Sequence, residues 1–276
     1  MHQGDGEKFD ENWEKTNEAY YTHFIKGPVQ NQIQFAFRKH WETAVKMLQK
    51  PIKELKVLEV GCGRGSLSAY FADEGAECHL LDISPKAIKI AEESFAQHGF
   101  KADFYVSDCL NMPFLNDTFD FVFSIGLLEH FEDVEPLLTE KQRVLKNGGM
   151  MFNYIVPEIP DNVQNKYEWV NHLLRTTVSD KSVQNKVEVY RSDSLSDRYI
   201  PIMESIGMNE IFYSGVYPLP MISHSPSFPF TLLNKDAELI LVKLFENILE
   251  TRRSEYTNPW LCDETYGQAI LVTGIK

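Results

Sequence analysis

A glycine-rich loop directly after an apolar run constrains this chain more than any other feature. Residues 57–60 have the composition of a buried parallel strand, and Gly61, Gly63 and Gly65 follow them. Because glycine lacks a Cβ atom, such a loop can turn sharply and let another molecule approach its backbone. Residues 66–74 then place apolar side chains at helical spacing. A strand, a glycine loop and a helix in this order are typical of the entrance to a nucleotide-type pocket.

Strand and helix patterns alternate from residue 55 to residue 156. Such alternation predicts a parallel sheet with right-handed crossovers and helices on both faces. The helix after the second strand has Ser84 as its expected N-cap, Pro85 in its first position and Gly99 at its end. After the first run, the pattern predicts strands at residues 77–82, 102–106, 119–124 and 150–156, and a helix at residues 134–145.

The regions on either side of this core follow a weaker pattern. Residues 1–50 indicate helices, and Pro51 ends them. The prolines of residues 217–230 exclude a central strand, although the Phe and Met residues among them favour burial. The remaining predicted elements are helices at residues 193–206 and 236–250 and strands at residues 211–216 and 268–275.

Composition restricts the class of protein. The 276 residues are 43% hydrophobic, which is enough for a substantial core, and the net charge is −13. An acidic surface disfavours binding to nucleic acid or to anionic membranes, because both need clustered basic residues. The four cysteines show no C-x-x-C spacing, and the first ten residues do not resemble a signal peptide. No run approaches the roughly 18–20 apolar residues of a membrane span. We therefore expect a cytoplasmic protein without a metal site.

The spacing of the glycines and nearby acids indicates what the loop binds. The dinucleotide fingerprint has glycine at its first, third and sixth positions, whereas here Ser66 occupies the sixth. Glu59 precedes the loop, and a carboxylate there suits a ligand with a cationic group better than a pyrophosphate. Asp82 lies about 20 residues beyond the loop, where a carboxylate can take a ribose hydroxyl pair. Asp108 follows the third strand and can accept a hydrogen bond from an exocyclic amine. Three acids at successive strand ends predict a ligand with amine and hydroxyl donors and no phosphate.

These motifs together resemble the class I S-adenosylmethionine-dependent methyltransferases. The resemblance covers about residues 55 to 156 and runs through five motifs in order: residues 58–65, 81–84, 108 with 112–114 and 119–120, 128–130, and 145–149. It implies a Rossmann-like, doubly wound, seven-stranded α/β sheet that is mostly parallel, with an antiparallel last strand. It also implies S-adenosylmethionine as the cofactor and S-adenosylhomocysteine as the product.

The resemblance carries over a set of cofactor-binding residues at the strand ends. Glu59, Gly61, Gly63 and Ser124 are expected beside the methionine part of the cofactor. Asp82 is expected to bind the ribose hydroxyls, and Ile83 to pack against the adenine. Asp108 is expected to accept from the adenine amine, and Cys109 to add a backbone contact. A solvated loop carboxylate or a helix cap is the alternative interpretation for each acid.

The chemistry of the cofactor leaves two tasks to the protein. The enzyme must align a nucleophile behind the activated methyl group and exclude water. An amine or hydroxyl acceptor must also lose a proton, which can call for a general base. His130 is the best catalytic candidate because it follows the fourth strand on the side where the pocket opens. The alternative is that Glu129 and His130 shape the loop without transferring a proton.

The regions outside the shared core are expected to choose the acceptor. We predict a helical cap at residues 1–50 and a methyltransferase domain at residues 51–276, with lid insertions at about 157–205 and 217–262. For each aromatic residue in these regions, ordinary core packing is the alternative. The substrate candidates are Tyr20, Tyr21, Arg38, Tyr154 and Phe228.

The sequence thus predicts an N- or O-methyltransferase that acts on a small molecule, natural products included. Two alternatives remain, a non-catalytic module that binds S-adenosylmethionine and a protein methyltransferase. Fold resemblance does not establish turnover. An NAD-dependent dehydrogenase is disfavoured by Ser66 and Glu59. We expect no nucleic-acid or membrane partner and a monomer or a homodimer.

Overall fold

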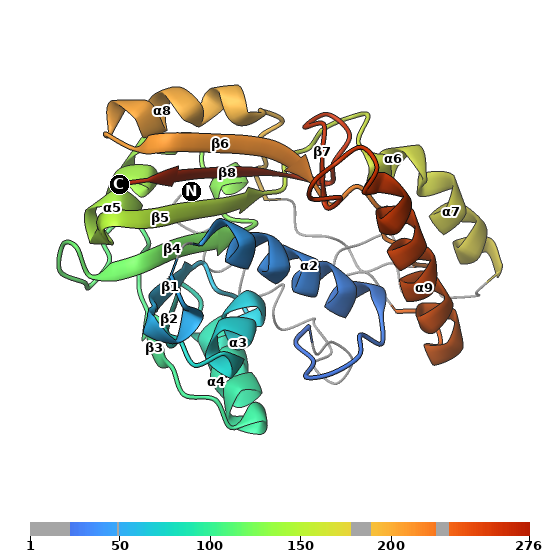
Figure 1. Cartoon of the computed structure of the whole chain (residues 1–276), viewed down its shortest axis with the longest axis horizontal. Helices are drawn as coiled ribbons and strands as arrows, with labels where there is room; N and C mark the ends of the chain where they lie inside the picture. Colours follow the sequence, from blue (N-terminus) through green and yellow to red (C-terminus); the bar gives the residue numbers. More distant parts are fainter. Residues whose placement is uncertain (1–22, 49, 178–188, 225–231) are drawn as a thin grey trace.

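A computed structural model of the chain describes residues 23–48, 50–177, 189–224 and 232–276. In these residues eight strands form one sheet in the order β3-β2-β1-β4-β5-β8-β6-β7 (Figure 1). The first five strands pair in parallel, and β8 lies antiparallel between β5 and β6. The strands are β1 (Lys56–Val60), β2 (Glu77–Asp82), β3 (Asp103–Val106), β4 (Phe119–Ile125), β5 (Leu145–Ile155), β6 (Asn209–Val216), β7 (Leu261–Cys262) and β8 (Ala269–Ile275).

The expected mostly parallel α/β sheet is confirmed, with one strand more than the seven predicted. The additional strand is β7, which has two residues and pairs with the end of β6. A strand this short has no alternating pattern to recognise. The described α-helices are α2 (Gln32–Met47), α3 (Ser66–Asp73), α4 (Pro85–His98), α5 (Glu135–Val144), α6 (Val163–Lys166), α7 (Glu168–Thr177), α8 (Ile200–Ser205) and α9 (Lys235–Arg252), and the 3₁₀ turns are η2 (Ile52–Glu54), η3 (Leu128–His130) and η4 (Ser196–Arg198).

Local signals place the ends of α4 where the sequence predicts them. The Ser84 hydroxyl accepts a hydrogen bond from the backbone N–H of Ala87 at 3.0 Å, and Pro85 is the first helical residue. Gly99 adopts the left-handed conformation, with φ of 71°, and ends the helix. Because α4 begins directly after β2, these signals also fix the backbone that follows Asp82.

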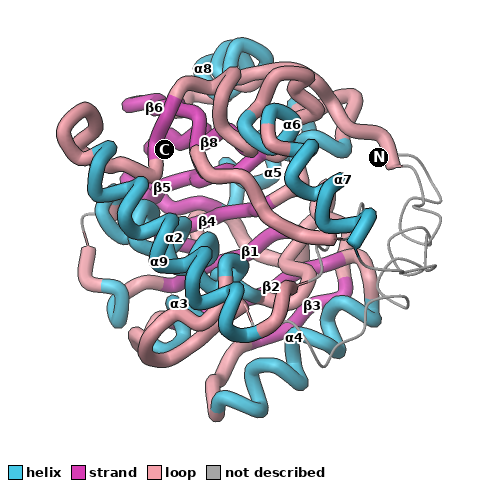
Figure 2. Tube along the Cα trace, turned by 90° about the vertical axis from the view of Figure 1, so that its right-hand side faces the viewer, coloured by secondary structure: helices cyan, strands magenta, loops and turns pink. Residues whose placement is uncertain are grey.

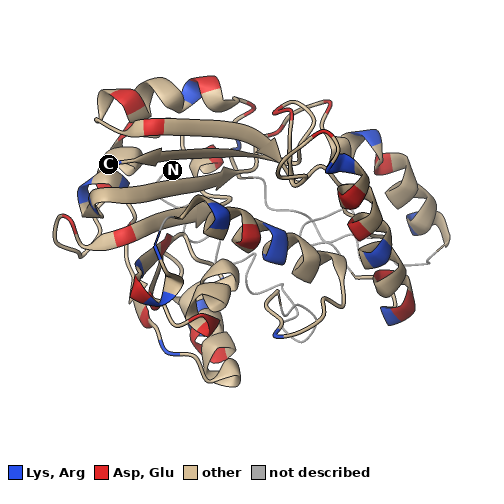
Figure 3. Cartoon of the chain, in the orientation of Figure 1, with Lys and Arg blue, Asp and Glu red and all other residues tan. Residues whose placement is uncertain are grey.

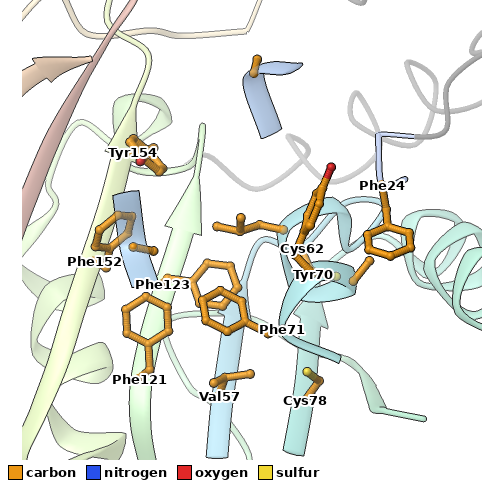
Figure 4. Packing of buried hydrophobic residues seen from close by; sticks show 14 of the residues in the cluster. Phe24, Val57, Cys62, Tyr70, Phe71, Cys78, Phe121, Phe123, Phe152 and Tyr154 are labelled. Carbon is orange, nitrogen blue, oxygen red and sulfur yellow. The ribbon is translucent and has the colours of Figure 1, made fainter. Parts of the chain in front are cut away.

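One face of the sheet packs on α2, α3, α4 and α9. In Figure 2, α2, α3 and α9 lie together on the left of the sheet. The core of this face contains a cluster of phenylalanine rings, in which Phe121 lies 5.4 Å from Phe71 and 5.6 Å from Phe152 between ring centroids (Figure 4). Phe123 stacks on Phe121 from the same strand. Burying such rings stabilises the sheet and its packing against α3.

The opposite face packs mainly on α5 and α8. Its core includes Val122 of β4, Met151 of β5, Leu137 of α5 and Met203 of α8, all fully buried. Side chains of one strand alternate between the two faces, so β4 contributes to both cores. A sheet covered on both faces explains why residues 119–125 read as a nearly continuous apolar run.

Two predicted elements differ in extent from the observed ones. The helix predicted at residues 193–206 is divided into η4 and α8, and Pro201 lies in the first turn of α8. Proline lacks an N–H and is tolerated in a first turn but not in the interior of a longer helix. β5 begins at Leu145, five residues earlier than predicted, and Gly148 turns within it with φ of 73°.

Charged side chains lie mainly on helices and loops (Figure 3). Acidic and basic residues are interspersed along α2 and α9 in this view. Within the described part of the chain, no helix combines the length and apolar character needed to cross a membrane. All four cysteines are buried and free.

Candidate active site

The strand order reverses between β1 and β4, which lie side by side in the sheet. β2 and β3 continue from β1 on one side, and β5 continues from β4 on the other. In open α/β sheets, ligands bind outside the carboxyl ends of the strands at such a switch point. The glycine loop of residues 61–65 follows β1 at this edge, and Gly126 and Leu127 follow β4. Residues from both loops therefore border the candidate site.

The glycine loop depends on its glycines for both conformation and space. Gly61, Gly63 and Gly65 have φ values of 67°, 51° and 66°, which side chains rarely adopt. A Cβ atom on Gly61 would lie 2.9 Å from Cδ1 of Leu127, and one on Gly65 would lie 2.4 Å from Cδ2 of Leu80. The loop therefore brings its backbone close to the β4 loop at the switch point.

The loop is tied to the end of β2 through Asp82. The N–H of Gly61 donates to the carbonyl of Leu81 at 2.8 Å, and the N–H of Gly63 donates to Oδ2 of Asp82 at 2.9 Å. The other carboxylate oxygen of Asp82 accepts from the N–H of Ser84, also at 2.9 Å. The predicted ribose carboxylate and the predicted glycine loop are thus directly connected.

Glu59 is buried below the loop and points toward α3. Its Oε2 accepts hydrogen bonds from the Ser68 hydroxyl at 2.6 Å and from the Ser68 N–H at 3.2 Å. The pKa of Glu59 is raised to about 8, mainly by burial. The charge of Asp82 also raises this pKa, whereas the hydrogen bonds from Ser68 lower it. In this arrangement Glu59 fixes the start of α3 relative to β1.

The ends of β2 and β3 expose apolar side chains next to a carboxylate. Ile83 and Leu110 are 41% and 40% exposed, whereas Cys109, in the loop after β3, is buried. Asp108 is exposed, and its Oδ1 accepts from the N–H of Leu110 at 2.9 Å. Exposed apolar surface beside an acceptor suits a flat heterocycle that carries an amine.

The structure places Ser124 inside the protein, on the α5 face of the sheet. Its side chain is fully buried, and its hydroxyl accepts from Nζ of Lys141 at 2.9 Å. The same ammonium donates to Oδ1 of Asn153, which lies beside Ser124 on β5. Burial lowers the pKa of Lys141 to about 7. Sequence reasoning missed Lys141, because a lysine on a predicted amphipathic helix is normally assigned to its solvent side.

His130 lies in the turn after β4, next to Glu129. Its Nδ1 is 2.8 Å from the carbonyl oxygen of Tyr190, a residue 60 positions later in the chain. Its Nε2 is 3.9 Å from Oε1 of Glu129. His130 is buried, with 9% of its side chain exposed.

The Glu129 carboxyl is buried with incomplete hydrogen bonding. Its Oε2 has no hydrogen-bond partner among the described residues, and the whole residue is 1% exposed. Burial raises the pKa of Glu129 to about 7, against lowering contributions from backbone N–H groups and from Arg191. Its Oε1 lies 3.4 Å from the position that a Cβ on Gly126 would take. The carboxyl therefore lies beside the backbone at the end of β4.

The region before α2 reaches the glycine loop through His23, which the sequence did not single out. Its Nδ1 is 2.7 Å from Oγ of Ser66, the first residue of α3. The ring stacks on Phe37 with centroids 4.6 Å apart. Burial lowers the pKa of His23 to about 3, and the charge of Arg64 contributes in the same direction. His23 is therefore neutral at physiological pH and joins the segment before α2 to the start of α3.

The predicted acceptor residues are only partly described. Tyr154 is fully buried, and its hydroxyl donates to the carbonyl of His40 at 3.2 Å. Arg38 donates to the carbonyl of Ile25 and lies 5.9 Å from the ring centroid of Tyr70. Both contacts are structural, and contact with an acceptor remains a prediction. The other candidates, Tyr20, Tyr21 and Phe228, lie outside the described residues.

Comparison with known proteins agrees with this geometry. Residues 58–153 match the family model described as "Methyltransferase domain". A sterol 4-C-methyltransferase from Caenorhabditis elegans is 33% identical over 177 residues, which cover 62% of this chain and 52% of that protein. A chloroplastic tocopherol O-methyltransferase from Arabidopsis thaliana is 32% identical over 152 residues, which cover 50% of this chain and 43% of that protein. The chain thus spans about half the length of these two curated relatives.

A solved structure has a similar fold. It is described as a SAM-dependent methyltransferase, possible histamine N-methyltransferase, from Thermotoga maritima. The TM-score is 0.54 at 17% sequence identity, and the match covers 99% of this chain and 100% of that one. The family model and the shared fold confirm the resemblance that the five sequence motifs indicate.

Proposed function

We propose that this chain, which carries a class I S-adenosylmethionine-dependent methyltransferase domain, transfers a methyl group to a nitrogen or oxygen atom of a small molecule. The observation that supports this most is the connection of the glycine loop to Asp82 at the switch point of the sheet. That connection places a carboxylate from the end of β2 beside the glycine loop, and in nucleotide-binding α/β folds a carboxylate at this position bonds the ribose.

The residues around the switch point fit the cofactor. Each carboxylate oxygen of Asp82 has two lone pairs, so it can hold the loop and still accept from ribose hydroxyls. Ile83 and Leu110 offer apolar surface for the adenine, and Asp108 an acceptor for its amine. The glycines leave room for the methionine part, and the Asp82 carboxylate favours a cationic ligand. The cofactor supplies a methyl group activated by its sulfonium.

The chain's own residues align the acceptor, exclude water and remove its proton. His130 lies after β4, across the switch point from the glycine loop, and is our candidate for the base. The regions at residues 1–50 and 157–262 are proposed to enclose the acceptor. The two curated relatives are named for sterol and tocopherol substrates, which supports a small organic acceptor.

Cofactor binding is tested by calorimetric titration of the full chain with S-adenosylhomocysteine and, separately, with NAD. We expect binding of the first and not of the second. Asp82→Ala removes charged hydrogen bonds to the ribose and is expected to weaken S-adenosylhomocysteine binding about 100-fold. Asp103→Ala, an exposed carboxylate at the other end of the neighbouring strand β3, is the matched control and is expected to bind like the parent. NAD binding without S-adenosylhomocysteine binding would overturn the proposal.

Turnover is tested by incubating the protein with methyl-labelled cofactor and a metabolite extract. We expect label in a small-molecule fraction. Cofactor binding without transfer to any fraction would favour a non-catalytic module. Label in the protein fraction alone would favour a protein methyltransferase. Analysis of the labelled product identifies the accepting atom.

A further inference from the structure

Residues 190–198 form a strap across the turn that carries Glu129 and His130. The N–H of Ser192 donates to the carbonyl of Glu129 at 2.9 Å, and the carbonyl of Ser192 accepts from the N–H of Glu158 at the same distance. The strap therefore lies between the β4 turn and the segment after β5. It belongs to the region beyond residue 153, outside the part of the chain that matches the family model.

The far end of the strap is anchored at two further points. Nη2 of Arg198 donates to the carbonyls of Phe131 at 2.6 Å and Glu132 at 2.8 Å. The carboxylate of Glu264 accepts from the N–H and the hydroxyl of Ser196, both at 3.0 Å. The strap is thus held to the turn at both of its ends. This number of polar contacts is more than a solvent-exposed connection requires.

The contact between the strap and His130 determines where the imidazole carries its proton. A backbone carbonyl can only accept a hydrogen bond, so Nδ1 of His130 must be the donor to Tyr190. In a neutral imidazole one nitrogen donates and the other accepts. Nε2 is therefore the nitrogen with the lone pair. A histidine without such a partner distributes its proton between both nitrogens.

We propose that the strap is a positioning element which fixes His130 in the Nδ1–H form, so that Nε2 accepts the proton of a hydroxyl or amine acceptor during methyl transfer. This inference rests on the proposed function. A bond forms between the acceptor oxygen or nitrogen and the methyl carbon. The bond from the methyl group to sulfur breaks, and its electron pair stays on sulfur. The acceptor's proton passes to Nε2.

Glu129 lies beside the nitrogen that takes the proton. Its Oε1 is 3.9 Å from Nε2. Such a base is useful where the acceptor is a hydroxyl, a phenol or an amine, because each of these has a proton to lose.

The tautomer of His130 is measured directly by nitrogen-15 NMR of histidine-labelled protein, without any acceptor. The His130 signals are assigned by their absence from His130→Asn. We expect a protonated Nδ1 and an unprotonated Nε2 in the parent chain. A dominant Nε2–H form would overturn the inference, whether or not the protein proves to be a methyltransferase. Absence of methyl transfer with the expected tautomer would instead contradict the proposed function.

The strap is tested by two variants that detach different parts of it. Ser192→Pro removes the N–H bonded to Glu129, and Arg198→Ala removes the anchor at the far end. We expect a mixture of tautomers in each and, with the acceptor identified above, kcat lowered about tenfold while KM changes less than about twofold. Lys89→Ala, which removes an exposed lysine paired with Glu93 on α4, is the matched control with parental behaviour. An unchanged tautomer and kcat in whichever strap variant folds would overturn the positioning role.

The base itself is tested by His130→Asn and His130→Gln. The Asn amide can replace the Nδ1 donor to Tyr190 but offers no base at the Nε2 position. We expect kcat to fall about 100-fold in both variants. Thermal stability should stay near the parent in His130→Asn and fall in His130→Gln, because Gln does not place a donor at Nδ1. Retention of full kcat in His130→Asn would overturn the assignment of His130 as the base.

Discussion

The two halves of the candidate site are built in different ways. On the cofactor side, Gly63 and Asp82 are joined by a hydrogen bond across 19 positions, within consecutive strand, loop and helix units. On the acceptor side, His130 is joined to Tyr190 across 60 positions, from a segment outside the shared domain. The first half depends on local backbone geometry and the second on long-range packing. Changes on the cofactor side should therefore affect folding and cofactor binding together, whereas strap changes should affect turnover.

The largest effect is expected from adding a side chain to the glycine loop. Gly65→Ala combines a positive φ with a Cβ 2.4 Å from Leu80 and should cost about 4 kcal/mol of unfolding free energy. Gly99→Ala is the matched control, because its φ is also positive but no atom lies within 4 Å, and it should cost about 1 kcal/mol. Urea denaturation of both variants measures the difference. Equal costs would mean that close packing does not constrain the loop.

The next effect concerns the buried carboxyl of Glu59. Its pKa is raised to about 8 in the folded chain, so the folded state holds a proton that the unfolded state loses above about pH 4.5. Stability contributed by Glu59 is therefore lost as pH rises from 4.5 to 8. Between pH 5 and pH 8 the parent should lose about 3 kcal/mol relative to Glu59→Gln, measured by urea denaturation.

Glu140→Gln is the control for this pH series. A hydrogen bond from Arg143 lowers the pKa of Glu140, so this side chain is ionised in the folded state throughout the range and mostly ionised in the unfolded state. Its difference from the parent should not change between pH 5 and pH 8. A flat difference for Glu59→Gln as well would show that Glu59 is not held in a desolvated site.

Lys141, below the ends of β4 and β5, should show the opposite pH dependence. Its pKa is lowered to about 7 by burial, so above pH 7 the unfolded state binds a proton that the folded state does not. The parent should therefore gain about 2 kcal/mol relative to Lys141→Met between pH 7 and pH 9. Urea denaturation at both pH values measures it. A parent that gains nothing relative to Lys141→Met would contradict the burial of Lys141 in this core.

The smallest effect is expected from removing helix caps. One cap lies at α4, beside Asp82 on the cofactor side of the candidate site, and the other lies at α9, in the region proposed to enclose the acceptor. Ser84→Ala at α4 and Asn234→Ala at α9 each remove a side-chain cap and should each cost about 1 kcal/mol. Because Ser84 also positions the N–H bonded to Asp82, its variant alone should weaken S-adenosylhomocysteine binding by a few fold. Thermal unfolding and calorimetric titration measure the two quantities. Equal weakening of S-adenosylhomocysteine binding by both variants would mean that the α4 cap has no special role on the cofactor side.

Much of the fold and of the cofactor side could be predicted because its signals are local. The strands of the parallel core, the cap at Ser84 and the end of α4 at Gly99 follow from short-range patterns that the structure confirms. The pairing of Gly63 with Asp82 follows from the fixed length of a strand–helix–strand unit. The two-residue strand β7 and the division of the helix at residues 193–206 could not be predicted as reliably, because short elements depend on neighbours far along the chain.

The sequence by itself determined the class of fold and the type of cofactor site, since glycine conformation, strand-end acids and apolar periodicity act over a few residues. Only the tertiary structure decided that Ser124 faces Lys141, that Tyr154 is buried under His40, and that Tyr190 holds His130. These contacts join elements through the packing of both sheet faces. No local pattern encodes the direction in which a side chain will meet a partner from a distant segment.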